Sequence, residues 1–273
     1  MTPVVLQAAA AAAAAILAGS SGLNMYQTYQ LSSYLDADRR GTLPRPPSSP
    51  PSATLAEYLP PAAAAGYRRP LVALAPPEKS VDDVLRDLRS MSRSELLNLF
   101  LRCPAPRDAA AAAGEWDGTL LDNGGIVMSS ASALLTDAAF GRGRSWAGKS
   151  IGVRGSGVRD VGGINRFRPR RPEEDRAAAE GTEAEHRFDC SVRPSRIDPG
   201  SESLLLEYRD YQGALSPWRG MRDELRVLRL SDGRRKRGGG GSVLIGMGCM
   251  DWSGAFWRDG FMNCAPFCLY IRD

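Results

Sequence analysis

The chain has 273 residues, of which 43% are hydrophobic, so it can bury a sizeable core. Its formal net charge of +4 is small for this length, which argues against nucleic-acid binding by the whole protein. The five cysteines are too few for a disulfide scaffold, and the chain has a single histidine. We therefore predict no metal site and no cofactor.

Residues 1–40 contain an uncharged, alanine-rich stretch over positions 3–23. Its length is close to the roughly 20 residues with which a helix spans a bilayer. Three interpretations stay open: a targeting segment for an organelle such as the plastid or for secretion, a retained single-pass membrane anchor, or an alanine-rich soluble helix. The anchor interpretation implies membrane association, with the body of the protein on the cytosolic or stromal side because of Arg39, Arg40 and Arg45.

Residues 41–79 are rich in proline and are expected to form an extended, disordered linker. Residues 80–103 have the pattern of two short helices. Ser80 with Asp83 and Ser92 with Glu95 match capping boxes, and apolar residues follow each at helical spacing. We expect the helices to pack outside the main domain or to plug one end of it, and a protein partner bound through residues 80–101 is the alternative.

Residues 114–273 alternate like short strands separated by glycine-rich turns, which predicts one mainly β domain, an antiparallel closed barrel. Apolar residues recur at every second position in four segments, and the last apolar run, from Cys264 to Ile271, should close against the strand near Trp116. The four sets are His186, Phe188, Cys190 and Val192; Leu204, Leu206 and Tyr208; Leu225 and Val227; and Val243, Ile245, Met247 and Cys249.

The segment from Gly143 to Ser150 satisfies the phosphate-loop pattern G-x-x-x-x-G-K-[ST]. That motif needs a strand before the loop and a helix after it. Here a helix-like segment, within 128–140, precedes it and a glycine-rich stretch follows it, so we do not assign nucleotide hydrolysis.

Trp116 lies in the sequence Gly114-Glu115-Trp116-Asp117-Gly118 and can seal one end of a barrel. An arginine stacked on its indole would complete the seal. Arg272 is the first candidate because it lies on the closing strand, and Arg226 is the second.

Several motifs follow one another in a fixed order: Gly114-x-Trp116-x-Gly118, Trp146-x-Gly148-Lys149, Tyr208, Asp223-Glu224-Leu225-Arg226, Ile245-Gly246-Met247 and Phe267-Cys268-Leu269-Tyr270. This series resembles the GXWXG-domain family of calycin-like proteins. The resemblance implies a lipocalin-like or fatty-acid-binding-like barrel, and it explains the Gly148-Lys149 pair without a nucleotide. It implies no particular activity.

Charged residues beside apolar strand residues are the best site candidates, because an inward charge must be paired or must meet a ligand's polar head. A salt-bridged barrel rim is the alternative interpretation. The predicted ligand-binding residues are Trp116, Trp146, Lys149, Tyr208, Asp223, Arg226 and Tyr270.

We predict a non-enzymatic barrel that binds an apolar or amphipathic small molecule, such as a lipid, pigment or isoprenoid. An isomerase or cyclase using Asp223, Glu224 or His186 is one alternative, although His186 lacks a recognisable nucleophile and is more simply a solvated or core histidine. An interaction or assembly factor with a filled barrel is the other.

Overall fold

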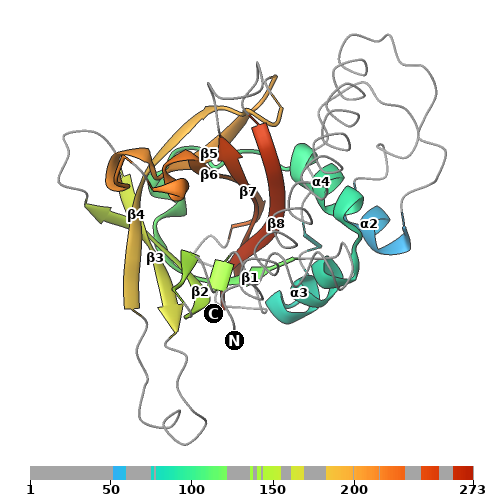
Figure 1. Ribbon diagram of the computed structural model, residues 1–273. Coiled ribbons are helices and arrows are strands. Elements are labelled where there is room, and N and C mark those ends of the chain that lie inside the picture. The colour runs from blue at the N-terminus through green and yellow to red at the C-terminus, as the bar shows by residue number, and fades with distance from the viewer. Residues whose placement is uncertain are drawn as a thin grey trace, which may run out of the picture.

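The computed structural model describes residues 52–59, 75–76, 78–121, 136–137, 140–142, 144–154, 161–168, 183–198, 200–214, 216–230, 241–251 and 261–272. Within this part, eight antiparallel strands form one closed barrel in which each strand pairs with the next (Figure 1). The predicted mainly β fold is therefore confirmed. The strands are β1 (Gly114–Leu120), β2 (Ser145–Arg154), β3 (Val161–Arg168), β4 (Glu183–Pro194), β5 (Glu202–Glu207), β6 (Met221–Arg229), β7 (Ser242–Asp251) and β8 (Phe261–Ile271).

The barrel closes between its first and last strands, as predicted. β1 pairs antiparallel with β8, and Asp117 is in register with Tyr270. Closure leaves no unpaired sheet edge along these strands. The described residues also form the short 3-10 helices η2 (Ala110–Ala112), η5 (Arg209–Tyr211) and η6 (Pro217–Gly220).

The interior of the barrel is an apolar core built from alternate residues of the strands. The alternating sets predicted on β4, β5 and β6 contribute to this core, with the exception of His186. The largest and best-enclosed members of this core are Trp116, Phe140, Ile151, Phe167, Phe188, Cys190, Leu204, Leu206, Tyr208, Leu225, Val227, Leu244, Phe267 and Leu269.

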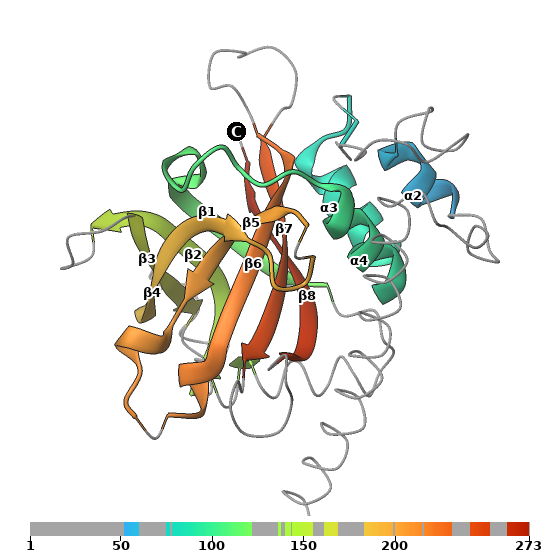
Figure 2. The ribbon, with the colours of Figure 1, turned by 90° about the horizontal axis from the view of Figure 1, so that it is seen from above.

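A second apolar core lies outside the barrel, between a helical layer and the outer face of β7 and β8. The layer consists of α2 (Ala53–Tyr58), α3 (Val81–Ser90) and α4 (Arg93–Arg102), which lie on one side of the barrel in two perpendicular views (Figures 1 and 2). Capping boxes start α3 at Ser80 and α4 at Ser92, as predicted. Of the two predicted positions for these helices, the structure has the one outside the barrel.

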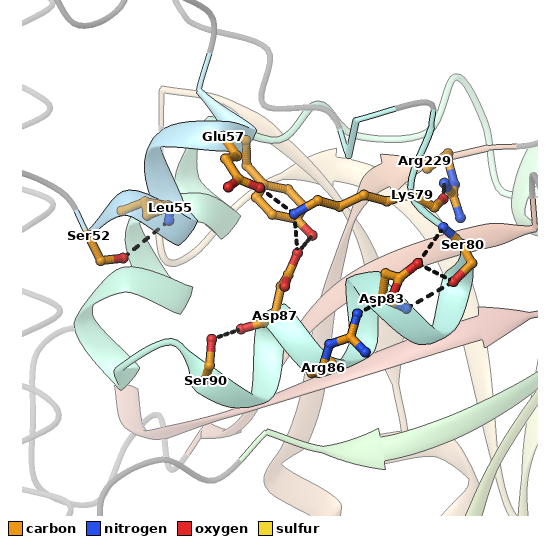
Figure 3. Close-up of polar contacts among 11 residues, drawn as sticks. Ser52, Leu55, Glu57, Lys79, Ser80, Asp83, Arg86, Asp87, Ser90 and Arg229 are labelled. Carbon is orange, nitrogen blue, oxygen red and sulfur yellow. Dashed lines mark hydrogen bonds and ion pairs between the residues drawn. The ribbon is translucent and has the colours of Figure 1, made fainter.

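Helix α2 lies within residues 41–79, where the sequence analysis predicted only an extended linker. The prediction was wrong for this segment because residues 52–59 contain no proline, and Ser52 caps the helix through Leu55 N. Polar contacts join α2 to α3 (Figure 3). The Tyr58 hydroxyl donates to Asp87 at 2.7 Å, and Lys79 pairs with both Asp87, at 2.6 Å, and Glu57.

The alternating apolar set on β7 faces the helices. Val243, Ile245, Met247 and Cys249 do share one face, but this is the outer face, and they belong to the second core. The inner face of β7 carries glycine at positions 246 and 248. A Cβ at Gly246 would lie 2.4 Å from the ring of Phe267, so this glycine gives an inward aromatic ring its space.

Several segments discussed above lie outside the described residues. They are the apolar stretch 3–23 and most of the helix-like segment 128–140. Among the helices that the structure does describe, none combines the length and the hydropathy required to cross a bilayer.

Candidate functional site

Lys149 points into the barrel from the middle of β2, and it is 2% exposed. The strand is irregular just before it, because its register with β3 shifts between Trp146 and Gly148. Gly148 has a φ of 139° and approaches β1 so closely that a Cβ there would lie 2.0 Å from Trp116 O. Gly148 thus allows β1 and β2 to approach closely, and the next residue, Lys149, points its side chain into the interior.

Three acceptors surround the Lys149 ammonium. Its Nζ lies 2.6 Å from Asn165 Oδ1, 2.7 Å from the Tyr208 hydroxyl and 2.8 Å from Asp223 Oδ2. An ammonium has three N–H groups, so its donors are all used. The Asp223 side chain is 4% exposed, which makes this a fully buried ion pair.

The acceptors around Lys149 are themselves linked. The Tyr208 hydroxyl donates to Asp223 Oδ2 at 2.7 Å. Asn165, on β3, accepts from Trp146 Nε1 at 3.1 Å and donates through Nδ2 to the Tyr208 oxygen at 3.1 Å. Its second Nδ2 hydrogen bond goes to His186 O at 3.2 Å. We call the set Trp146, Lys149, Asn165, Tyr208 and Asp223 the interior polar network.

Aromatic rings enclose the Lys149 end of this network. The Nζ atom lies between 5.3 and 5.6 Å from four ring centroids, those of Trp146, Phe188, Tyr208 and Phe267. These distances are within the range of cation–π attraction. The rings also exclude water, which strengthens each hydrogen bond of the network.

Burial sets the electrostatics of the network. It lowers the pKa of the Lys149 ammonium, and the neighbouring Asp223 carboxylate acts in the opposite direction. Burial also raises the pKa of Tyr208 well above its ordinary value, and the nearby charge of Asp223 adds to this rise. Tyr208 therefore remains a neutral donor over the whole physiological range.

No family model, curated protein or solved structure matches this chain. The resemblance to the GXWXG-domain family accordingly remains a prediction from the sequence motifs. The fold and the interior polar network are the observations from which a function can be argued.

Of the predicted ligand-binding residues, Trp146, Lys149, Tyr208 and Asp223 come together in the interior polar network. Trp116 also lies inside the barrel, where its Nε1 donates to Ala112 O at 2.9 Å. Asn165 was missed, although it is a fully buried polar residue of β3 in register with Lys149. Only the strand pairing places it there, so the sequence offered no direct signal.

Arg226 was predicted to contact the ligand, and the structure corrects this. It is on the outer face of β6, where its guanidinium lies over Phe100 at 4.8 Å and donates to Leu101 O at 2.9 Å. It also pairs with Asp198 at 3.5 Å. Because side chains alternate along a strand, Arg226 cannot share a face with Asp223. Glu224 is likewise outside, bound to Ser195.

Tyr270 and Arg272 also lie away from the interior. Tyr270 belongs to the core beneath the helices. The Arg272 guanidinium lies over the Tyr270 ring at 4.7 Å and pairs with Asp82 at 2.9 Å, with half of its side chain exposed. The predicted stacking of Arg272, or of Arg226, on Trp116 is therefore wrong, because each guanidinium stacks on another ring.

His186 is packed rather than solvated. Its ring stacks on Phe140 with centroids 4.1 Å apart, and Nε2 donates to Phe140 O at 2.8 Å. Gln212 Nε2 lies 3.2 Å from Nδ1, which acts as the acceptor. Burial lowers the pKa of the imidazole. The residue adopts a φ of 55°, a left-handed conformation uncommon outside glycine. These contacts match the core-histidine interpretation.

The phosphate-loop pattern has a different role in this fold. Lys149 lies within β2, which continues to Arg154, so no helix begins after the Gly148-Lys149 pair. Two residues of this pattern, Trp146 and Lys149, instead belong to the interior polar network. Chemically, this network can hold one polar group of a molecule whose remainder is apolar.

Proposed function

We propose that this protein binds and carries an apolar or amphipathic small molecule, such as a lipid, pigment or isoprenoid, inside its barrel. The observation that carries the proposal is the position of the Lys149–Asp223 ion pair, which is fully buried in an aromatic interior rather than at the barrel rim. A few polar groups within apolar walls are typical of small-molecule sites. A buried ion pair also contributes little to stability by itself, so a role in recognition accounts for its presence better.

The test is native mass spectrometry of the full chain purified from its own cells, followed by organic extraction. We expect a bound small molecule that is released on denaturation. Repeated recovery of the ligand-free protein, together with no mass gain after incubation with a total lipid extract, would refute the proposal.

A double variant tests whether the molecule binds at the ion pair. Lys149→Met with Asp223→Leu removes both charges together, so neither is left unpaired, and it should reduce the recovered ligand. Arg272→Ala changes a half-exposed residue of the outer surface and should leave the ligand in place.

An isomerase or cyclase on the same barrel is the second candidate. Asp223 as base and Tyr208 as acid lie 2.7 Å apart inside the barrel, and this pair favours such chemistry. Glu224 does not support such chemistry because it faces outward and is bound by Ser195. His186 does not support it because its Nε2 is hydrogen-bonded to Phe140 O. Asp223→Asn would abolish turnover in an enzyme, whereas a carrier has no turnover to lose.

The helices are used in packing. The apolar side chains of α3 and α4 are buried against β7 and β8. This supports their interpretation as a structural layer over the interpretation as a docking site for a protein partner.

A further inference from the structure

The interior polar network has one hydrogen-bonding position left. Lys149 uses its three donors, and Tyr208 donates once and accepts from Lys149 and Asn165. Asn165 uses both amide hydrogens and accepts twice at Oδ1. Asp223 accepts both of its bonds at Oδ2. Among the described residues, no hydrogen bond reaches Asp223 Oδ1.

The strand next to Asp223 leaves room at this oxygen. Gly248 on β7 is the register partner of Asp223, and its backbone is half-buried rather than enclosed. A Cβ at Gly248 would lie 3.2 Å from Asp223 Oδ1, and its next contacts would be Ala265 O at 3.7 Å and Phe267 at 3.9 Å. A side chain at position 248 would therefore press against Oδ1, so the glycine leaves this oxygen uncovered on the β7 side, beside an aromatic ring.

The charge balance restricts what can occupy this position. Lys149 and Asp223 already neutralise each other at 2.8 Å. An anionic head group would add an uncompensated charge to a buried site and would meet the carboxylate itself. An ester or ether offers only acceptors, so Asp223 Oδ1 would stay unpaired. A neutral hydroxyl supplies the missing donor without adding charge.

We propose that the ligand is a neutral amphipathic alcohol, whose hydroxyl donates a hydrogen bond to Asp223 Oδ1 beside Gly248 while its apolar part packs on the aromatic wall. This inference rests on the proposed carrier function and specifies its ligand class. A hydrogen bond to a charged acceptor in an apolar site is worth roughly tenfold or more in affinity.

The test compares three probes that share one apolar chain: farnesol, its methyl ether and farnesoic acid. Binding to the full-length protein is followed by quenching of tryptophan fluorescence, because Trp146 belongs to the network. We expect farnesol to bind roughly tenfold more tightly than the ether, and the acid to bind most weakly.

Gly248→Ala is the decisive variant, because its Cβ would lie 3.2 Å from Asp223 Oδ1 and cover that oxygen without changing any charge of the network. Farnesol and the ether should then bind equally. Gly213→Ala is its control, since a Cβ at Gly213 would meet nothing within 4 Å, and it should keep the preference for the alcohol.

The outcomes separate this inference from the carrier function. Binding of the acid or the ether to the unaltered protein as tightly as farnesol would overturn the alcohol assignment and leave the carrier function standing. This comparison needs no variant, so it holds even if Gly248→Ala does not fold. A folded Gly248→Ala that still prefers farnesol would overturn it too. If none of the three probes binds, the alcohol assignment is overturned, and native mass spectrometry of the purified chain decides the carrier function separately.

Discussion

The Lys149 ammonium lies 2.8 Å from the Asp223 carboxylate across the inside of the barrel, where both side chains are almost completely buried. The two residues are far apart in sequence and come from β2 and β6. A pair in this position makes each partner dependent on the other, because either charge alone would be buried without compensation. The same pair fixes Tyr208 and Asn165, so the whole interior polar network depends on it.

Replacing Lys149 alone should strongly destabilise the fold. Lys149→Met leaves the Asp223 carboxylate buried and uncompensated, which costs about 3–5 kcal/mol in the free energy of unfolding. Lys149→Met with Asp223→Leu removes both charges and should recover much of this loss. Urea denaturation of the two single variants and the double variant gives the coupling energy. Additive effects would mean that the two charges do not interact in the folded protein.

Gly118 should tolerate no side chain. A Cβ there would lie 2.5 Å from the Trp146 ring and 2.9 Å from Gly148 Cα. Gly118→Ala should therefore lower the free energy of unfolding by about 1–3 kcal/mol, the usual cost of overpacking, and shift the tryptophan emission. Gly213→Ala, in open space, should change stability by less than about 0.5 kcal/mol. Equal stability of the two variants would show that Trp146 does not pack against β1.

The sequence was sufficient to predict the barrel, and four of the seven residues predicted to bind the ligand lie in the interior polar network. Strand alternation on β4, β5 and β6 is clear, and the β1–β8 closure follows from it. These features are local, so they can be read along the chain.

The assignment of faces was less predictable, because some strands are buried on both sides. On β6, Leu225 lies in the interior core and Arg226 lies beneath α4, and both are fully buried. On β7 the inner positions 246 and 248 are glycines, so the visible apolar alternation marks the outer face instead. Hydrophobic periodicity shows that one face of a strand is buried, but it does not show whether the barrel interior or the helical layer covers that face.

Arg226 should matter for the helical layer and not for the ligand. Arg226→Met removes the hydrogen bond to Leu101 O and the 3.5 Å ion pair with the buried Asp198 carboxylate, so we expect a loss of about 3 kcal/mol in the free energy of unfolding. Hydrogen exchange should accelerate at the amides of α4. Arg272→Met, at a half-exposed ion pair, should cost less than about 1 kcal/mol. Loss of ligand with unchanged stability of Arg226→Met would restore this residue to the binding site.

His186 should make stability depend on pH. Burial lowers its pKa in the folded protein, whereas an unfolded histidine titrates near pH 6.5. As the pH falls below about 6.5, the unfolded chain binds the proton first, so the free energy of unfolding decreases; above that pH the contribution is fully present. Protonation would also turn Nδ1 from an acceptor into a donor facing Gln212 Nε2.

The variant His186→Asn removes the titrating ring and keeps a residue that tolerates the φ of 55°. Urea denaturation between about pH 5 and 8 should give a smaller decrease at low pH for the variant than for the unaltered protein. The comparison concerns the slopes, because the loss of stacking on Phe140 lowers the absolute stability at every pH. Arg142, Arg144 and Lys149 also oppose protonation, whereas the hydrogen bond to Phe140 O favours it. Parallel slopes would show that the buried imidazole does not control the acid sensitivity of the barrel.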